Sequence, residues 1–554
     1  MRRLSALLAI PLFVGGCSSE QDEPATPSTA PLTVLNAGSI APFSSCEQLL
    51  GYYVDGALDL VGPYGLDGNM GYAVDEMGDE SGRFDRGGDD SGDAASAADS
   101  GAESADAAGA AEFSGTNNQE EGVDEADTVK TNGSIIVAIA DGALRIVGVQ
   151  EGEVLATMAL DDVARGAYQS EMLLSGHTVV LMSTGSVDER PTWRRWLDPF
   201  GEDSADSSAD MAWPGRQQSS RTTITRIDIS DPSSPTVLGS TRMEGSYRSA
   251  RLIGDSVRLV MESSPTGLEF EYPRNGSLRA ERDAEQTNRD VIKNSTLDDW
   301  VPHIETIDAD GERGEVEPLS DCADVSRPDV FSGLSTVSVV TLDVADDSSD
   351  EVRAFAPTSA VSLIASGETV YASTDRLIVA TSPWGEWAMP FDTQLTRDGS
   401  ISTSLHSFDI SDPARTDYVA SGQIKGTLIN QFALSEADGV IRAATTSEPS
   451  WMAAESADEL VSQSTLFMIA EEGDELVVTG SVGGLGKTEQ IKSVRYLSPD
   501  LAAVVTFRQT DPLYLIDTSD PTEPIVTGEL KIPGYSAYLH PLDEDHLLGI
   551  GQEA

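Results

Sequence analysis

Cysteine, histidine and basic residues are scarce in this sequence, and each shortage excludes a class of protein. With three cysteines and five histidines among 554 residues, the chain is too poor in these residues for a disulfide-rich scaffold or a cysteine-rich metal site. Lysine and arginine number 35 against 93 aspartate and glutamate residues, which gives a formal net charge of −58. Because like charges repel, this excess argues against nucleic-acid backbones and anionic membrane surfaces as partners.

One short apolar run, at 4–14, lies at the N-terminus, and it is too short to cross a bilayer. With the preceding Met-Arg-Arg and the following Gly-Gly-Cys it has the composition of a secretory signal peptide over 1–17. The residues ending at Cys17 also resemble the bacterial lipobox, in which the cysteine is diacylated. We therefore expect an exported protein, lipid-anchored through Cys17 in the cell envelope, at the outer membrane or cell surface. A plain secreted protein with an incidental Cys17 is the alternative.

Two cysteines remain once Cys17 carries lipid. Outside the cytoplasm a disulfide between Cys46 and Cys322 can persist, and it would tie the N-terminal segment to the main body. Two unpaired, buried thiols are the alternative, because a sequence gives no geometry for the pair.

Composition divides the remainder of the chain. Residues 18–40 are rich in Ser, Pro, Thr and acids and form a flexible tether, and residues 41–72 form a small, partly helical segment. Residues 73–115 are an acidic linker with too little apolar surface to offset its ordering entropy, so we expect disorder there. Short β-rich runs then fill 116–554, with a helical insert at about 277–302.

A recurring element sets the fold class. LHSFDISDP at 405–413 returns as LYLIDTSDP at 513–521, as ITRIDISDP at 224–232 and in degenerate form at 339–346. Two further copies, at 144–148 and 466–470, keep only the pattern of strand, turn and return strand. The aligned residues of the six copies are Gly148, Asp228, Asp343, Asp409, Ala470 and Asp517, and successive copies are 47 to 115 residues apart. The shortest spacing predicts an all-β propeller of about 6–8 four-stranded blades, with insertions in the longer ones.

The aspartates of this element have two interpretations. Asp517 and Asp520 lie close enough together to be ligands, but the same residues recur where no single site could use every copy. We therefore interpret them as turn caps that accept hydrogen bonds from nearby backbone amides, with Pro521 ending the ladder.

Three longer stretches carry a resemblance. They are 116–133 (TNNQEEGVDEADTVKTNG), the run from 491–496 (IKSVRY) through 505–514 (VTFRQTDPLY) to 528–541 (GELKIPGYSAYLHP), and 288–300 (NRDVIKNSTLDDW). Together they resemble a family of secreted bacterial and archaeal proteins with a C-terminal β-propeller distantly related to Trp-Asp repeat propellers. The resemblance implies fold and export, and it implies no activity, ligand or catalytic residue. Because the sequence stops on a strand where another hairpin is expected, we also expect the propeller to be C-terminally truncated.

No pattern predicts a catalytic residue, a metal site or a cofactor. The histidines lack the His-x-x-x-His spacing of zinc sites, and there is no Gly-x-Ser-x-Gly nucleophile motif. Asp308-Ala-Asp-Gly311 is a fragment of a calcium loop without its later ligands, so Ca²⁺ stays an open alternative.

Two pairs of tryptophans are candidate ligand contacts: Trp193 with Trp196, and Trp384 with Trp387. Paired exposed aromatics stack on sugars or anchor a protein partner, although they can equally pack insertion loops onto the propeller. We therefore interpret the protein as a monomeric binding or scaffolding module for an envelope protein or glycan, touching the membrane only through its lipid anchor. The alternatives are an envelope hydrolase or lyase acting on polysaccharide or peptide, and a calcium-stabilised structural surface protein.

Overall fold

The fold is taken from a computed structural model of the chain. The structure describes residues 40–66, 118–150, 152–160, 166–186, 220–273, 275, 277–328, 333–344, 355–367, 369–381, 401–447, 461–508, 511–532, 534–543 and 546–552. The acidic linker, Cys17 and the four candidate tryptophans lie outside these residues.

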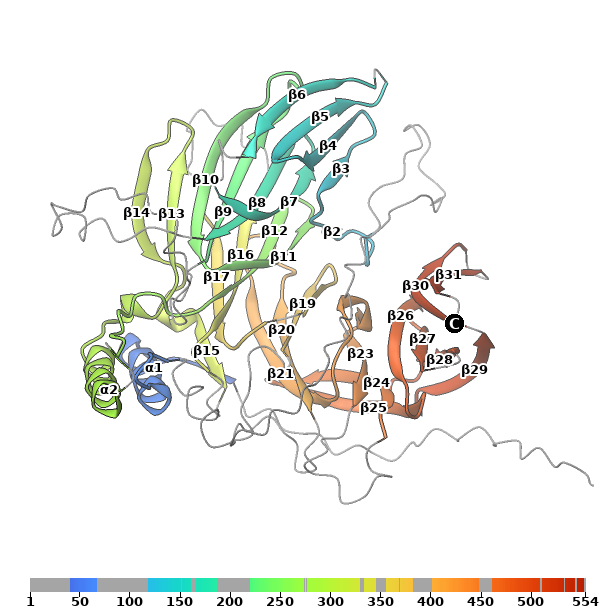
Figure 1. Cartoon of the computed structure of the whole chain (residues 1–554). Coiled ribbons are helices and arrows are strands. Elements are labelled where there is room, and N and C mark those ends of the chain that lie inside the picture. The colour runs from blue at the N-terminus through green and yellow to red at the C-terminus, as the bar shows by residue number, and fades with distance from the viewer. Residues whose placement is uncertain are drawn as a thin grey trace, which may run out of the picture.

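Four-stranded antiparallel blades follow one another along the chain, and they are arranged around an arc (Figure 1). The strands of the first three blades are β3 (Val129–Thr131), β4 (Ile135–Ala140), β5 (Ala143–Gly148) and β6 (Val154–Ala159); β7 (Ala167–Ser175), β8 (Thr178–Ser186), β9 (Ser220–Asp228) and β10 (Thr236–Glu244); and β11 (Ser246–Ile253), β12 (Ser256–Ser263), β16 (Thr336–Asp343) and β17 (Ser359–Ile364).

Three more blades and a hairpin complete the described part of the domain. Their strands are β18 (Thr369–Ala372), β19 (Arg376–Thr381), β20 (Ser402–Asp409) and β21 (Asp417–Lys425); β22 (Leu434–Ala437), β23 (Val440–Ser447), β24 (Gln463–Glu472) and β25 (Glu475–Leu485); β26 (Gln490–Ser498), β27 (Leu501–Phe507), β28 (Asp511–Asp517) and β29 (Ile525–Ile532); and the hairpin β30 (Tyr535–Pro541) with β31 (Leu547–Gln552). The predicted all-β propeller is confirmed.

Every copy of the sequence repeat is the third strand of a blade. These strands are β5, β9, β16, β20, β24 and β28, and five of them end on the residue that the repeat aligns: Gly148, Asp228, Asp343, Asp409 and Asp517. The blades are held together by apolar clusters shared between neighbours. In one of them Leu466 of β24 packs with Val504 of β27, and both side chains are fully buried.

The interpretation of the repeat aspartates as turn caps is confirmed. The Asp517 carboxylate accepts from the Ser519 backbone N–H at 2.9 Å, and Asp520 accepts from Thr522 in the same way at 2.9 Å. The same bonds join Asp409 to Ser411 at 2.9 Å. Hydrogen bonds from the Ser519 hydroxyl and, to a smaller extent, from its backbone N–H lower the pKa of Asp517. Thr522 lowers the pKa of Asp520 in the same way.

Insertions extend two of the blades at their outer edges. β13 (His303–Asp308) pairs with β10 and carries β14 (Arg313–Pro318), so that a hairpin inserted into the third blade extends the second. β15 (Val325–Pro328) pairs with β17, and β1 (Ile40–Pro42) pairs with β15. The N-terminal segment therefore enters the body as an added strand of the third blade.

Two helices form a cap on this edge, which we call the helical cap: residues 40–66 together with 264–302. α1 (Cys46–Leu60) begins at Ser45, whose hydroxyl accepts from the Gln48 backbone N–H at 3.3 Å. α2 (Leu278–Lys293) begins at Ser277 and lies beside α1 (Figure 1). Tyr53 stacks on Trp300 with ring centroids 5.4 Å apart, and both residues are buried. Neither helix of the described ranges is long and apolar enough to span a membrane.

Candidate functional site

The stretch 118–127, part of the first sequence signature, crosses the first strands of four consecutive blades, and we call it the signature strap. Within it β2 (Asp124–Glu125) pairs with β11, and Asp127 exchanges backbone hydrogen bonds with Met172 of β7 at 3.1 and 2.8 Å. The Gln119 side chain donates to the carbonyl of Leu434 in β22 at 2.8 Å. Since first strands of different blades meet only around the propeller axis, the strap lies at the centre of the domain.

Buried charges fix the strap in place. Lys130, which is 3% exposed, donates to Asp124 at 2.8 Å. Arg251 of β11 is equally buried, and its Nη2 donates to Gln431 Oε1 at 2.8 Å. The Gln431 amide in turn donates to Glu125 at 3.0 Å. Each buried charge thus has a partner, as a low-dielectric interior requires.

A third carboxylate of the strap, Glu120, contacts the fourth and fifth blades. Tyr371 of β18 donates to Glu120 Oε1 at 2.9 Å and accepts from the Glu436 backbone N–H at 2.7 Å. Burial raises the pKa of Glu120, while the Tyr371 hydrogen bond and then the charge of Arg442 oppose the rise. Through these contacts, Glu120 links the strap to the fourth and fifth blades.

Replacing Gln431 with alanine is expected to lower the free energy of unfolding by about 2 kcal/mol, because it removes hydrogen bonds to two charged groups, the buried Arg251 and the partly buried Glu125. Denaturant unfolding followed by circular dichroism measures the change. Gln286→Ala, on an exposed face of α2, is the matched control and is expected to be neutral. Equal stability of the two variants would contradict the role given to Gln431.

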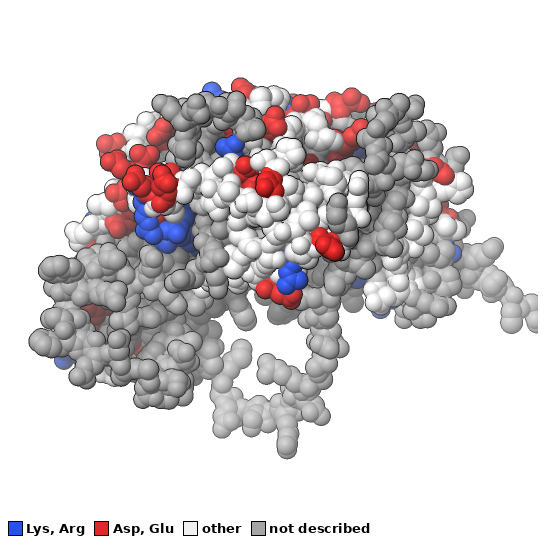
Figure 2. Space-filling model, turned by 90° about the horizontal axis from the view of Figure 1, so that it is seen from above, with Lys and Arg blue, Asp and Glu red and all other residues white. Residues whose placement is uncertain are grey.

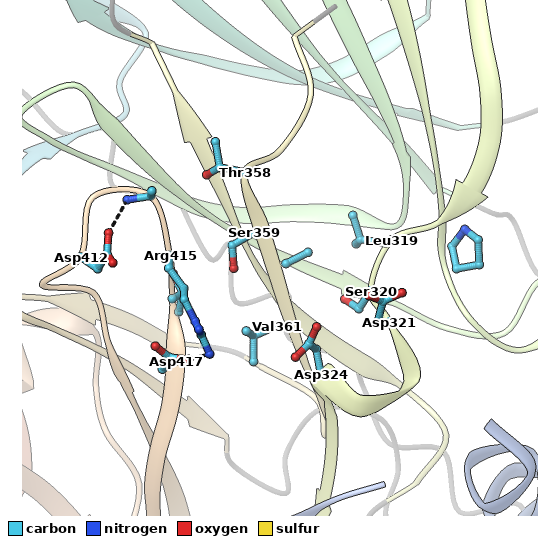
Figure 3. Close-up of a pocket in the computed structure, with 14 residues that line it drawn as sticks. Leu319, Ser320, Asp321, Asp324, Thr358, Ser359, Val361, Asp412, Arg415 and Asp417 are labelled. Carbon is cyan, nitrogen blue, oxygen red and sulfur yellow. Dashed lines mark hydrogen bonds and ion pairs between the residues drawn. The ribbon is translucent and has the colours of Figure 1, made fainter. Parts of the chain in front are cut away.

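A cavity of about 680 Å³ lies between the third and fourth blades, beside the helical cap (Figure 3). We call it the interblade pocket. It is lined by Pro318, Leu319, Ser320, Asp321, Asp324, Thr358, Ser359, Ala360, Val361, Asp412, Ala414, Arg415, Thr416 and Asp417. Carboxylates stand on both walls: Asp321 and Asp324 on one, Asp412 and Asp417 on the other (Figure 3).

The first wall is fixed covalently. Asp321 precedes the 3₁₀ turn η5 (Cys322–Asp324) and Asp324 ends it. Cys322 is disulfide-bonded to Cys46 at the start of α1, with the two Cα atoms 5.3 Å apart. Cys46 and Cys322, which the sequence offered as a pair, are thus brought together in the structure. The cap therefore holds this wall of the pocket through a bond that spans 276 residues of sequence.

The second wall is the turn between β20 and β21, and a buried arginine of the third blade fixes it. Arg258 of β12, 1% exposed, donates to the carbonyls of Ile410 at 3.1 Å, Asp412 at 2.5 Å and Arg415 at 3.3 Å. Burial lowers the pKa of Arg258 to about 10, with the Asp412 charge opposing, so the guanidinium stays charged at neutral pH.

Chemically, the pocket offers acceptors and hydroxyls in a concave, pre-formed setting. Arg415 pairs with Asp417 at 2.5 Å, which leaves carboxylate charge in excess among the lining residues. Such a lining suits a ligand rich in hydroxyl or amino groups. Elsewhere acidic side chains are spread over the face that is shown in Figure 2, with basic ones in only a few places.

Three histidines of the described ranges have side-chain partners within the fold. His303 pairs with Glu244 at 3.0 Å, and His546 with Asp543 at 2.7 Å in an exposed turn. His406 of β20 is buried, with its Nδ1 2.6 Å from the Ser421 hydroxyl, and burial lowers the pKa of His406 to about 4.

His406 predicts a pH dependence of stability. In the unfolded chain a histidine takes up a proton near pH 6.5, whereas folded His406 stays neutral down to about pH 4, so its contribution is present above pH 6.5 and is lost as the pH falls toward 4. Lowering the pH from 7 to 5 is expected to cost roughly 2 kcal/mol through this residue. Urea unfolding at a series of pH values measures this dependence: His406→Gln should flatten the plot of unfolding free energy against pH, whereas His546→Gln should not. Parallel plots for His406→Gln and the unmodified protein would contradict the role given to His406.

No group of three or more His, Cys, Asp or Glu side chains within the described ranges is placed to hold a metal ion. In the calcium-loop fragment, Asp308 accepts from the backbone N–H of Asp310 and of Glu312, each at 2.9 Å, and so closes the β13–β14 turn.

Sequence reasoning missed both the strap contacts and the interblade pocket. The strap had a visible signal, since four carboxylates fall within the signature at 120–125. The pocket had none, because its walls come from segments about 90 residues apart that meet only in the folded blades.

Comparisons with known proteins agree with this architecture. Residues 113–554 match the family model described as a beta propeller domain. A stretch of 130 residues is 41% identical to an uncharacterized protein of Archaeoglobus fulgidus, covering 24% of this chain and 18% of that protein. Another of 155 residues is 37% identical to an uncharacterized protein of Methanocaldococcus jannaschii, covering 28% and 22%. The chain thus spans about a fifth of the length of these curated relatives.

Proposed function

The chain belongs to the beta-propeller domain family, and from this premise we propose that it is an exported, lipid-anchored module of the cell envelope that binds an envelope glycan in the interblade pocket. The pocket carries the proposal, because it is a concave polar site whose two walls are fixed before any ligand arrives. Pre-organised walls lower the entropic cost of binding.

Export and anchoring rest on two features of different kinds. The first 17 residues have the composition of a lipoprotein signal peptide ending at Cys17. The Cys46–Cys322 disulfide is a bond that persists in oxidising compartments outside the cytoplasm. Mass spectrometry of the N-terminal peptide from membranes tests this part: an acylated Cys17 supports it, and an unmodified one overturns it.

A glycan fits the lining better than an apolar ligand does. The pocket has carboxylates on facing walls and hydroxyls from Thr358 and Ser359, groups that pair with sugar hydroxyl and amino groups. The chain carries a formal net charge of −58, so charge disfavours a polyanionic ligand and favours a neutral or amino-bearing sugar chain.

Binding is tested with the folded Cys17→Ser chain and oligosaccharides released from the producing organism's own envelope. Calorimetry is expected to give saturable binding, and the double variant Asp324→Asn, Asp417→Asn is expected to weaken it about tenfold or more. Asp310→Asn, in the exposed β13–β14 turn, is the control and should bind as the parent does. Binding that is indifferent to both sets of changes would show that the pocket is not the site.

A second candidate function follows from the carboxylates on opposite walls of the same pocket. Paired carboxylates are the catalytic groups of most glycoside hydrolases, one as acid and the other as base or nucleophile. Prolonged incubation of the same oligosaccharides separates the two functions. Shortened products that disappear in the Asp324→Asn, Asp417→Asn variant would favour hydrolysis, and unchanged oligosaccharides favour binding alone.

A further inference from the structure

Four partly exposed side chains with aromatic or cationic character meet at the propeller axis. Arg495 belongs to β26, the first strand of the sixth blade, and its guanidinium lies over the Phe432 ring, with Cζ 5.8 Å from the ring centroid. Phe432 belongs to η6 (Gln431–Ala433), just before the first strand of the fifth blade. Tyr538 of β30 meets Phe432 edge-on with ring centroids 6.4 Å apart, and its hydroxyl lies 3.2 Å from His540 Nδ1. We call these four residues the axial cluster.

Hydrogen bonds between neighbouring units of the fold hold the axial cluster in place. β26 and β30 lie side by side (Figure 1), and the Ser493 hydroxyl of β26 donates to the Ser536 carbonyl of β30 at 2.8 Å. The Tyr496 hydroxyl, also of β26, donates to the Ala433 carbonyl of η6 at 3.0 Å. The cluster is therefore positioned by the fifth blade, the sixth blade and the β30–β31 hairpin together.

Arg495 has neither a hydrogen-bond partner nor an ion-pair partner among the described residues. Its Nε and Nη1 are buried without an acceptor while the residue as a whole is partly exposed, so Nη2 is the nitrogen that a ligand reaches first. Arg442, by contrast, donates through Nη1 to the carbonyls of Ser498 and Pro499, each at 2.8 Å. The contact with Phe432 engages the charge of Arg495 and none of its N–H groups. A partly buried guanidinium without an acceptor destabilises the fold, which is typical of a functional position.

Glu120 of the signature strap is close enough for the charge of Arg495 to act on it, but it is bound elsewhere. Its Oε1 accepts from Tyr371 at 2.9 Å, and no ion pair joins it to Arg495 in the part of the chain that the structure describes. Burial raises the pKa of Glu120, and the charge of Arg495 is one of the influences that oppose the rise. Because Glu120 and a chain of formal net charge −58 repel further negative charge, a singly charged anion suits Arg495 better than a polyanion does.

We propose that the axial cluster binds the carboxylate of a small organic acid that also carries an apolar or aromatic group. Arg495 donates to the carboxylate, in the charge-assisted pairing that is characteristic of arginine. Phe432 and Tyr538 provide the rings against which the remainder of the ligand packs. The interblade pocket lies between the third and fourth blades, so the axial cluster is a separate site and does not depend on glycan binding.

Benzoate is the probe, because it joins one carboxylate to one aromatic ring. A ligand-observed NMR titration of the folded Cys17→Ser chain is expected to give saturable binding with a Kd on the order of 1 mM, as suits a ligand of this size. Benzamide has nearly the same shape without the charge, and it is expected to bind at least about tenfold more weakly.

Arg495→Gln is expected to weaken benzoate binding at least about tenfold, and Arg495→Lys is expected to retain part of the affinity because it keeps the charge. Arg508→Gln is the matched control, since Arg508 is an exposed arginine just after β27 of the same blade, and it should bind as the parent does. Arg495 makes no hydrogen bond within the described fold, so its replacement should leave the urea midpoint close to that of the parent.

Equal affinity of benzoate for the parent and for Arg495→Gln would overturn the proposal, and so would the absence of saturable binding to the folded parent. Equal affinity of the parent for benzoate and benzamide would show that the rings alone hold the ligand, and it would refute recognition of a carboxylate. Inorganic phosphate should not displace benzoate; displacement would assign the cluster to anions in general and overturn its preference for an organic acid. Asp324→Asn, Asp417→Asn should bind benzoate as the parent does, which separates this outcome from that of the glycan test.

Discussion

Replacing Cys46 and Cys322 with alanine is expected to lower the free energy of unfolding by about 5 kcal/mol, since the bond closes a loop of 276 residues and the entropy removed from the unfolded chain grows with loop length. The same change loosens one wall of the interblade pocket, because Asp321 and Asp324 flank Cys322. Affinity for a pocket ligand should therefore fall together with stability.

Urea unfolding in the Cys17→Ser background measures this effect. Reduction of the parent with a thiol is the matched control: it should give the same midpoint as the double alanine variant, and the reductant should leave that variant unchanged. Cys46 is exposed, so the reagent reaches the bond. If the double alanine variant lost only the helical structure of α1, and the urea midpoint of the propeller did not change, the disulfide would hold the helical cap in place without stabilising the propeller.

The strand framework was accessible from the sequence because it depends on local patterns. Alternating apolar residues followed by Ser-Asp-Pro specify a third strand and its turn wherever they occur, and they located three strand ends to the residue: Asp228, Asp409 and Asp517. Helix α1 was equally local, since Ser45 caps it and Leu49, Tyr53 and Ala57 recur at helical spacing. Capping and periodicity act over a few residues, so one sequence suffices to predict them.

The candidate site depends on contacts between distant segments, which a single sequence does not encode in readable form. Asp324 and Asp417 meet in one pocket although neither belongs to a motif. Arg258 is one of many arginines in the sequence, and only the packing of the third blade on the fourth turns it toward the β20–β21 turn. The disulfide was proposed from compartment and cysteine number alone; the cap geometry that permits it comes from folding.

Replacing Arg258 with alanine is expected to lower the free energy of unfolding by about 4 kcal/mol, because a buried guanidinium that donates to several backbone carbonyls is removed and these carbonyls lose a charged donor. Ser256, whose hydroxyl donates to the Pro413 carbonyl at 2.6 Å, keeps one contact to the turn. The turn should then loosen without detaching, so the second wall of the pocket loses its fixed shape.

Arg415→Ala is the matched control, since Arg415 belongs to the same turn but its side chain is exposed and forms a surface ion pair with Asp417. A surface ion pair contributes about 0.5 kcal/mol, so this variant should unfold close to the parent. Hydrogen exchange of residues 410–417 should rise in Arg258→Ala and stay unchanged in Arg415→Ala. Faster exchange across all blades in Arg258→Ala would instead assign Arg258 to the stability of the whole propeller, whereas exchange confined to this turn makes it the residue that positions the pocket wall.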